Sequence, residues 1–487
     1  MNSGIARKAS HIGKQAIVIG AGISGLAAAC ALAGHFDQVV VLESDQLPDL
    51  ATPRPGVPQG KQAHGLLGGA IKALEELFPG FAQDLTLAGA VALNPGFEIL
   101  QEMPGMDRFP LGKWDWGIYA LTRPLIERTM RRRVERHTNI SLRGGCRVLE
   151  IMATLDGSLA TGVRLETGSR TEILPADLVV DASKHGGLTM SFLQAAGLSA
   201  PEETTVGVDI RYGTALFTLA DNAMGQFKAI VTFAKAPEGV HSAYLLPVER
   251  NCYQLLLIGR GDDAPPADGD EFLAYAQKLP TQSVGNAMKG AKRLSEVARY
   301  GFPESRWRHF AQLDPFPQNL LPIGDAICCL NPIYGQGITV AVQEANILRC
   351  LLSTNAAERH PPAMLARQFL TKAEALVKEP WAMSAVPDFI YPRTRGERPV
   401  DLEQRLNSQF ALTRLATRDP AVWKLMSEVR HLLRPLAALE EPGLVRRVET
   451  EMATIDEESS EVTSARRSPH RLSFKAAMEP VVLKGSL

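Results

Sequence analysis

The stretch that decides the fold is Gly20-Ala21-Gly22-Ile23-Ser24-Gly25, a G-x-G-x-x-G motif near the N-terminus. Residues 15–19 before it are apolar and β-branched and predict a buried strand, and residues 23–33 predict a helix of small side chains. Between a strand and a helix, glycines allow a tight turn and let the backbone approach a pyrophosphate at the helix N-terminus. The sequence therefore predicts a dinucleotide-binding loop made by Gly20, Gly22, Ser24 and Gly25.

An acidic residue follows at the distance that such a site requires. Residues 39–42 predict a second strand, and Glu43 ends it, about 20 residues after the loop. A carboxylate at this place accepts hydrogen bonds from ribose hydroxyls and disfavours a 2′-phosphate. We therefore expect Glu43 to bind the ribose of the dinucleotide.

Composition limits the class of protein. The chain has 487 residues, enough for two or three domains, and its 45% hydrophobic and 22% charged residues are typical of globular proteins. The formal net charge of −1 gives no reason to expect a nucleic-acid partner. The longest uncharged stretch, residues 16–34, is explained by the glycine motif, so we expect no signal peptide and no membrane-spanning helix. Six scattered cysteines without a C-x-x-C pair favour a cytoplasmic protein with reduced thiols and no metal site.

A second glycine-containing segment lies about 300 residues after the first. It begins with Gly324-Asp325 at the end of a predicted strand and continues through residues 331–337, Asn-Pro-Ile-Tyr-Gly-Gln-Gly, into a long predicted helix. Two other stretches lie between the loops. Residues 58–64 form a polar loop, and residues 177–183, Asp-Leu-Val-Val-Asp-Ala-Ser, predict a strand that runs into a turn.

With these four stretches the chain resembles FAD-dependent monooxygenases of the aromatic-hydroxylase (para-hydroxybenzoate hydroxylase-like) fold, nearest the epoxidase-type branch. Flavin halogenases and geranylgeranyl reductases belong to the same superfamily. The resemblance covers residues 14–355 and weakens beyond them, and the second glycine segment is its most specific part. It implies that the dinucleotide is FAD rather than NAD.

The resemblance and the order of predicted elements imply an α/β fold. It would contain a Rossmann-like FAD-binding domain, an inserted mixed β-sheet substrate domain and a C-terminal helical region. We expect the following boundaries: FAD binding in residues 12–78, 120–200 and 300–355, the substrate-binding sheet in 79–119 and 201–299, the helical region in 356–455, and a flexible tail in 456–487.

The resemblance also assigns roles in the second loop. Asp325, after Gly324, would accept hydrogen bonds from the ribityl hydroxyls of FAD. Pro332 would lie near the flavin ring, and the backbone amides of Gly335-Gln336-Gly337 would face its pyrimidine edge. The helix that follows would point its N-terminus at that edge and stabilise the anionic reduced flavin by about 0.3–2 kcal/mol. Pro332, Gly335, Gln336 and Gly337 are therefore candidate catalytic positions.

Three residues outside the two loops are further candidates. Arg123 matches an arginine that binds the cofactor in many relatives, although an arginine at the start of a helix can also lie on the surface. Lys61 and His64 occupy a loop that lies near the flavin in related enzymes. We expect Lys61 to bind the cofactor, and His64 is a candidate catalytic group whose alternative is a structural role.

The sequence departs from its relatives in one turn. Where they read Asp-Ala-Ser-Gly-Arg-Gly-Ser, this chain reads Asp-Ala-Ser-Lys-His-Gly-Gly, so Lys184 and His185 replace a glycine and an arginine. In hydroxylases this turn helps to hold both FAD and the incoming nicotinamide. If the glycine has a positive φ, Lys184 is strained. The departure leaves two sources of electrons open, NAD(P)H or a partner reductase.

The activity that the resemblance implies is oxygenation. Reduced FAD and dioxygen would form a flavin hydroperoxide, which would transfer one oxygen atom to a bulky apolar or aromatic substrate by hydroxylation or epoxidation. This chemistry needs a dry cavity more than it needs protein acids and bases. The alternatives are an FAD-dependent halogenase, a polyprenyl reductase, and a hydroxylase that acts on a side chain of a protein or carrier.

Four aromatic residues are candidates for substrate contact. Trp114 and Trp116 lie in Trp-Asp-Trp-Gly-Ile-Tyr, which resembles the W-x-W-x-I-P stretch of tryptophan halogenases but lacks its proline. They either line a substrate cavity or pack in the core, and the same alternatives hold for Trp381. Tyr212, in the predicted inserted sheet, is the fourth candidate.

Overall fold

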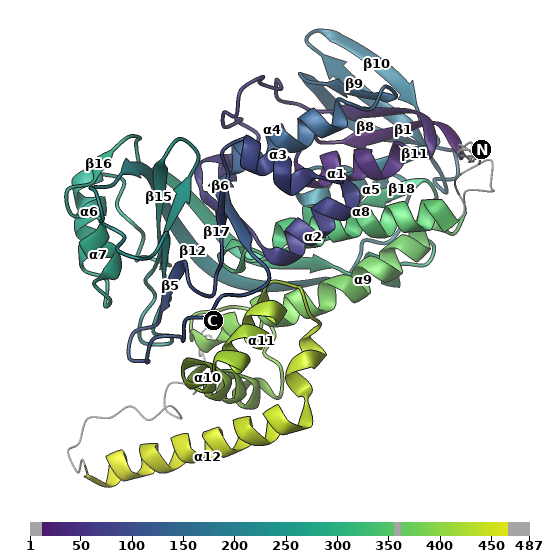
Figure 1. Cartoon of the computed structure of the whole chain (residues 1–487). Helices are drawn as coiled ribbons and strands as arrows, with labels where there is room; N and C mark the ends of the chain where they lie inside the picture. The colour runs from purple at the N-terminus through teal and green to yellow at the C-terminus, as the bar shows by residue number, and fades with distance from the viewer. Residues whose placement is uncertain (1–11, 355–360, 362, 466–487) are drawn as a thin grey trace, which may run out of the picture.

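A five-stranded parallel sheet carries the first glycine motif (Figure 1). The computed structural model describes residues 12–354, 361 and 363–465. The strand order is β18-β11-β1-β2-β7, and every neighbouring pair is parallel. Its strands are β1 (Gly13–Ile19), β2 (Phe36–Leu42), β7 (Ile140–Arg143), β11 (Leu178–Asp181) and β18 (Leu320–Pro322).

Both faces of this sheet are covered, which is why its central strands are continuous apolar runs. Val18, Val39 and Val41 belong to one buried cluster with residues of several helices. Ile17 and Val40 point to the other face, where a small antiparallel sheet and a helix cover them. The covering elements are α1 (Ile23–Leu32), α4 (Arg123–Val134), α8 (Gly337–Thr354), β8 (Cys146–Ala153), β9 (Ala160–Thr167), β10 (Arg170–Pro175) and α5 (Gly187–Ala195).

The second part of the molecule is an eight-stranded mixed sheet built around the long strand β12 (Glu203–Thr218). The order along its main path is β19-β17-β12-β15-β14-β13-β5, and β16 pairs with β12. The other strands are β5 (Ile99–Glu102), β13 (Ala229–Thr232), β14 (Ser242–Val248), β15 (Cys252–Arg260), β16 (Lys292–Arg293), β17 (Ala298–Arg308) and β19 (Cys328–Cys329). The sheet therefore extends beyond the expected boundary at residue 299, because residues 300–308 of β17 pair with β12.

The two faces of the mixed sheet have different partners. Leu255 and Leu257 pack against α6 (Gly269–Gln277) and α7 (Ser283–Ala287), which lie on the outer side of the sheet in Figure 1. The intervening residue Leu256 points to the opposite face, as the alternation of side chains along a strand requires. This opposite face forms one wall of the cavity described below.

A small three-stranded sheet and two helices complete the described part of the chain before α4. The strand order of this sheet is β3-β6-β4. These elements are β3 (Ala63–Leu66), β4 (Val91–Leu93), β6 (Ile118–Thr122), α2 (Gly68–Leu77) and α3 (Phe81–Leu87).

The C-terminal region is helical, as expected. α9 packs along α8, and the other helices form a group at the bottom of Figure 1. They are α9 (Leu365–Ser384), α10 (Leu402–Arg418), α11 (Pro420–Arg430) and α12 (Pro442–Ala465). Residues 456–465 of the expected tail belong to α12, and residues 466–487 lie outside the described residues.

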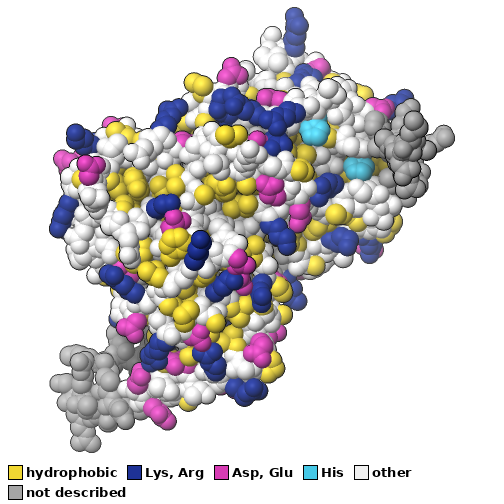
Figure 2. Space-filling model, in the orientation of Figure 1, with side chains coloured by type: hydrophobic (Ala, Val, Ile, Leu, Met, Phe, Trp, Pro, Cys, Tyr) yellow, Lys and Arg dark blue, Asp and Glu magenta, His cyan; other side chains and the backbone are white. Residues whose placement is uncertain are grey.

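The surface carries charges of both signs, in keeping with the small net charge. Figure 2 shows Lys and Arg side chains gathered at the top of the view, where Figure 1 places the arginine-rich helix α4. Over the described ranges, no helix has the length and apolar character needed to cross a bilayer.

Candidate functional site

A cavity of about 600 Å³ extends from the first glycine loop to the mixed sheet. At one end it is lined by Gly20 and Gly22, and in its middle by Asp325. At the other end it is lined by Tyr212 of β12 and by Arg430, the last residue of α11. Four segments that are far apart in sequence therefore share one cavity.

The first loop forms one end of the cavity. Gly20 has a φ of 99°, and a Cβ there would lie 2.9 Å from the carbonyl oxygen of Ala182. Ser24, in the first turn of α1, also lines the cavity. Gly25 does not line it, since Gly25 packs against the loop itself and a Cβ there would lie 1.9 Å from the Gly20 oxygen. Gly25 therefore allows the helix to approach the strand, the third role of glycine in such a motif.

Glu43 lines the same end, at the end of β2. Its Oε2 accepts a hydrogen bond from the Ala21 amide at 2.9 Å and lies 3.0 Å from Nη1 of Arg54. Burial disfavours the charged form, but Arg54 and the backbone amides of Asp45 and Ala21 outweigh it, so the pKa of Glu43 is lowered. Glu43 is therefore an ionised, fixed acceptor at the place where a ribose is expected.

Arg54 was not predicted from the sequence. It is buried, lines the cavity, and also pairs with Glu127 at 3.0 Å. It comes from the irregular segment between β2 and β3, where no motif marks it. Its position brings a cation to the end of the cavity at which a pyrophosphate would lie.

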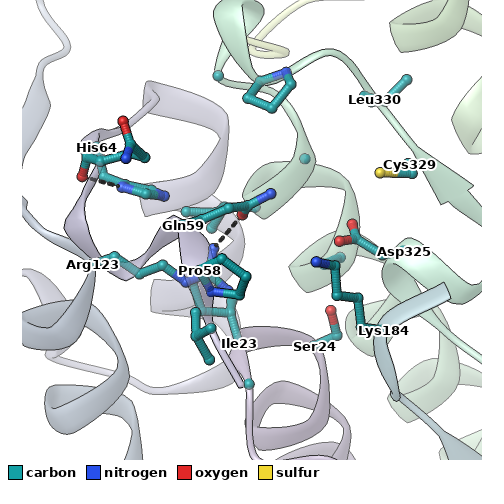
Figure 3. A pocket seen from close by; sticks show the side chains of 18 of the residues that line it. Ile23, Ser24, Pro58, Gln59, His64, Arg123, Lys184, Asp325, Cys329 and Leu330 are labelled. Atoms are coloured by element: carbon teal, nitrogen blue, oxygen red, sulfur yellow. Dashed lines mark hydrogen bonds between the residues drawn. The ribbon is translucent and has the colours of Figure 1, made fainter. Parts of the chain in front are cut away.

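Asp325 occupies the middle of the cavity, after β18 (Figure 3). The preceding Gly324 has a φ of 66° and does not line the cavity; its amide donates to Oε2 of Glu344 in α8 at 2.6 Å. The Asp325 side chain is exposed to the cavity, although the cavity itself is enclosed by protein. Desolvation by the surrounding protein raises its pKa, whereas the nearby Arg123, His185 and Lys184 act in the opposite direction.

Arg123 lies on the cavity wall rather than on the outer surface. It is the first residue of α4, and its Nε donates to Oε1 of Glu127 at 3.0 Å. Its Nη1 donates to Oε1 of Gln59 at 3.2 Å, a contact drawn in Figure 3. These two acceptors hold the guanidinium beside the middle of the cavity.

The unusual turn after β11 has its strained backbone at a different residue from the one expected. Positive φ values occur at His185 (65°) and Gly186 (58°), not at Lys184, so the prediction that Lys184 is strained is wrong. The reason is that Lys184 begins a short 3₁₀ helix, Lys184–Gly186, and the left-handed residues come after it. The Lys184 side chain lines the cavity and points toward Asp325 in Figure 3.

The second loop continues the wall toward the mixed sheet. Pro332, Gly335 and Gly337 line the cavity, and Gly335 has the left-handed φ of 70° that ends the 3₁₀ helix Pro332–Tyr334. Gln336 is buried and does not line the cavity, because its Nε2 donates to the carbonyl oxygen of Arg430 at 3.1 Å. Its side chain therefore joins the loop to α11.

The loop of residues 58–64 places one candidate on the cavity and one away from it. His64 lines the cavity, and its Nδ1 lies 2.9 Å from the carbonyl oxygen of Gln62. Burial and the nearby Arg123 lower the pKa of His64 to about 3, so the ring is neutral at pH 7. Lys61 is exposed and does not line the cavity. Its carbonyl oxygen accepts a hydrogen bond from Nε2 of Gln254.

Of the four aromatic candidates, Tyr212 alone lines the cavity. The Trp114 ring lies 5.0 Å from that of Trp116 and 5.9 Å from that of Trp423, so these tryptophans cover the apolar faces of the C-terminal helices. Trp381 is buried beside Trp307, with the ring centres 5.7 Å apart. The expectation of substrate contact fails for Trp114, Trp116 and Trp381 because the helices need these side chains for packing.

Several residues at the sheet end of the cavity were not predicted. They are mostly apolar or aromatic, and two polar residues from the end of α11 accompany them. Burial and the neighbouring Arg430 lower the pKa of His431 to about 3, which makes its ring neutral at pH 7. No sequence signal marks this wall, which consists of Ile99, Ile118, Val231, Phe233, Tyr244, Leu246, Leu256, Tyr334, Arg430 and His431.

Comparison with known proteins shows the family. No family model matches the chain. Protein Rv3254 of Mycobacterium tuberculosis is 31% identical over 395 residues, which cover 78% of this chain and 81% of that protein. This chain belongs to the Rv3254 family.

Solved structures show the fold of this member of the Rv3254 family. The flavin-dependent brominase Bmp2 is similar with a TM-score of 0.61 and 15% identity, over 92% of this chain and 100% of that chain. p-Nitrophenol 4-monooxygenase PnpA of Pseudomonas putida is similar with a TM-score of 0.61 and 16% identity, over 85% of this chain and 97% of that chain. The predicted FAD-dependent aromatic-hydroxylase-like fold is confirmed.

The cavity of this Rv3254-family protein fits a flavin dinucleotide. A Cβ added at Gly22 or at Gly337 would meet no atom within 4 Å, so both glycines open onto the cavity. Gly22 precedes α1 and Gly337 begins α8, so two helix N-termini face the same space. Helix N-termini bind anionic groups through free N–H groups and the helix dipole. The structure thus offers one anion-binding end for a pyrophosphate and another for a flavin ring.

Proposed function

We propose that this protein is an FAD-dependent monooxygenase that inserts one oxygen atom from dioxygen into a bulky apolar or aromatic substrate. The observation that carries the proposal is the single cavity that joins the Gly20–Gly25 loop to an apolar chamber on the mixed sheet. A cofactor bound along the first part would present its reactive ring to a substrate in the second. This arrangement supports an enzyme rather than a simple FAD-binding module.

Residues along the first part of the cavity are suited to hold FAD. Glu43 would accept from the ribose, and Gly20, Gly22 and Ser24 with the N-terminus of α1 would hold the pyrophosphate. Arg54 and Arg123 would add positive charge, and Asp325 would accept from the ribityl chain. The segment from Pro332 to Gly337 would lie along the ring. When bound, FAD supplies the two-electron redox chemistry and the reaction with dioxygen that side chains lack.

The protein contributes orientation and exclusion of water. The chamber walls are apolar residues such as Val231, Leu246 and Leu256, which keep competing water away from the reacting atoms. His64 is neutral, and its Nδ1 donates to the carbonyl oxygen of Gln62, so its Nε2 carries a lone pair. We propose that His64 acts as a hydrogen-bond acceptor for the substrate rather than as a charged acid.

The source of electrons is part of the proposal. Either NAD(P)H or a partner reductase would reduce the flavin, and Lys184 and His185 occupy the turn in which relatives hold both cofactors. Lys184 would meet FAD near Asp325, because its side chain points into the cavity there. Whether the oxygen enters as a hydroxyl or an epoxide depends on the substrate.

The test is coupled oxygen consumption by the FAD-reconstituted protein. The expected result is incorporation of one labelled oxygen atom from dioxygen into product, with the other in water. Reduction of a double bond without oxygen uptake would instead assign a reductase, and product formation that requires bromide or chloride would assign a halogenase. A protein that cannot be reconstituted with FAD would overturn the whole proposal.

A further inference from the structure

The sheet end of the cavity contains one cation without a carboxylate partner. Arg430 lines this end, and its guanidinium carbon lies 5.2 Å from the centre of the Phe233 ring. Within the described ranges, its side chain makes no ion pair and no hydrogen bond that meets the usual distance limits. Burial lowers the pKa of Arg430, and the effects that oppose this come from Tyr244 and Tyr334. Arginine nevertheless stays charged in proteins, so this charge needs a counterion.

Other buried or half-buried arginines around the cavity show the contrast. Arg54 pairs with Glu43 at 3.0 Å, and Arg123 pairs with Glu127 at 3.0 Å. Arg260, behind the second loop, pairs with a buried aspartate at 2.6 Å. The chain thus neutralises each of these guanidinium groups with its own carboxylate, whereas Arg430 has no carboxylate partner among the described residues and lies against the Phe233 ring. This difference points to a partner that comes from outside the chain.

Arg430 is also held in place from its backbone. Its carbonyl oxygen accepts from Nε2 of Gln336, and the carbonyl oxygen of His431 accepts from the Gly69 amide at 2.9 Å. At Gly69 a Cβ would lie 2.5 Å from the His431 oxygen, so glycine lets α2 approach this turn. Because its backbone is held, Arg430 loses less freedom on binding an anion than an arginine on a mobile segment would.

We propose that Arg430 binds a carboxylate of the substrate, so that the substrate is an aromatic or other apolar carboxylic acid. This inference rests on the proposed function, because it places the substrate at the sheet end of the cavity. The planar fork of a guanidinium matches a carboxylate through two parallel hydrogen bonds. Phe233 beside it, and Leu246 on the wall of the same cavity, would contact the apolar body of the substrate.

A carboxylate fits this end better than a phosphate ester does. The two histidines that line the cavity, His64 and His431, are neutral at pH 7 because burial lowers the pKa of each to about 3. The other cations that line the cavity lie along its cofactor part, among them Arg123 and Lys184. One guanidinium balances one negative charge, whereas a phosphate ester carries up to two.

The test compares matched pairs of aromatic acids and their amides, such as 2-naphthoate with 2-naphthamide and 4-phenylbutyrate with its amide. Binding to the FAD-reconstituted protein is measured by calorimetry and by the change in flavin absorbance. The acid should bind about 10- to 100-fold more tightly than its amide, the range expected for hydrogen bonds to charged groups. This preference should vanish in Arg430→Met, persist in part in Arg430→Lys, and be unchanged in Arg434→Met, whose arginine is exposed and pairs with Glu428.

The outcomes separate this inference from the proposed function. If the acids bind no better than their amides, or do not bind, carboxylate binding by Arg430 is overturned, even if the protein binds FAD and consumes oxygen. The same holds if the preference survives in Arg430→Met, or if that variant loses FAD instead. If the wild-type protein does not take up FAD, the proposed function fails, and calorimetry on the protein as purified still measures the preference. The comparison of acids with amides uses the wild-type protein, so it still tests the proposal if a variant misfolds.

Discussion

Asp388 anchors Asn331, whose Nδ2 donates to the Asp388 carboxylate over 2.7 Å. Both residues are buried, and the same carboxylate receives Nη2 of Arg260 at 2.6 Å. Asn331 in turn caps the 3₁₀ helix of the second loop by accepting from the Ile333 amide. The part of the loop that faces the cavity is therefore held by a residue from the segment after α9, far beyond the motif.

Removal of Asp388 should destabilise the protein strongly. Asp388→Ala leaves Arg260 buried without its partner, which costs about 3–5 kcal/mol of unfolding free energy. Urea denaturation measures the loss. Asp262→Ala, which breaks an exposed pair with Arg393, should cost less than about 1 kcal/mol. The double change Asp388→Leu with Arg260→Met should cost less than Asp388→Ala alone, and a larger cost for the double change would contradict this account.

The second and third glycines of the first loop should respond differently to added side chains. Gly22 has a φ of −75° and opens onto the cavity, so Gly22→Val should fold normally but bind FAD at least about tenfold more weakly. In Gly25→Ala the new Cβ would overlap the Gly20 oxygen, so the protein itself should lose stability. Thermal unfolding without FAD, followed by FAD titration, distinguishes the two. Equal losses of stability in both variants would count against the assignment.

Asp325 should matter for the cofactor and little for the fold. Because its carboxylate faces the cavity, Asp325→Ala should weaken FAD binding by about 10- to 100-fold, the effect of losing hydrogen bonds to a charged acceptor. Asp325→Asn should lie between this variant and the wild type. The visible absorbance of the purified protein gives the first readout, and Asp221→Ala, at an exposed turn, is the control. Undiminished FAD affinity in Asp325→Ala would remove Asp325 from the site.

Glu344 should make stability depend on pH. Burial raises its pKa from 4.5 to about 8, against the effect of the Gly324 amide that donates to it. Between these pH values the folded protein keeps a proton that the unfolded chain releases, so stability falls as pH rises, by about 1.4 kcal/mol per pH unit. Glu344→Gln cannot ionise and should escape this loss. Relative to the wild type, it should therefore gain about 2–3 kcal/mol between pH 5 and pH 7 in urea denaturation.

One outcome of this pH experiment would contradict the prediction. If the difference in unfolding free energy between Glu344→Gln and the wild type is the same at both pH values, Glu344 has an ordinary pKa in the folded state. Taking the difference between the two proteins cancels the titration of all other groups. Both proteins are compared without FAD, so that cofactor binding does not contribute.

The sequence predicted those parts of the fold that follow from local pattern. The strand–loop–helix around Gly20 needs only short apolar runs and glycines at fixed spacing, and β1 and α1 form where these patterns place them. Glu43 was predicted in the same way, since it directly follows β2 at the edge of the sheet. Asp325 was predicted from the family resemblance of the second loop. The inserted sheet was recognised from its strands, but its limit was placed at residue 299, near the start of β17, because pairing between distant strands leaves no local signal.

The parts that the sequence did not reveal depend on tertiary contacts. The positive φ of His185 is set by the 3₁₀ turn that precedes it, so a comparison of residue types placed the strain on Lys184 instead. Trp114 and Trp116 look like binding residues in isolation, but their partners are on α11 and the elements around it. Arg430 reaches the cavity only because α11 packs against α2 and the second loop, and nothing in its neighbouring sequence indicates this.

The contact between His431 and Gly69 has a consequence for how the site is completed during synthesis. The glycine loops, Glu43 and Asp325 all precede the end of α8, whereas Arg430 and His431 are added after two further long helices. A growing chain can therefore assemble the cofactor half of the cavity while its opposite wall is still missing. The enzyme would be able to hold a flavin before it has a place for a substrate, and the last helices to be made would convert an open flavin site into a closed reaction chamber.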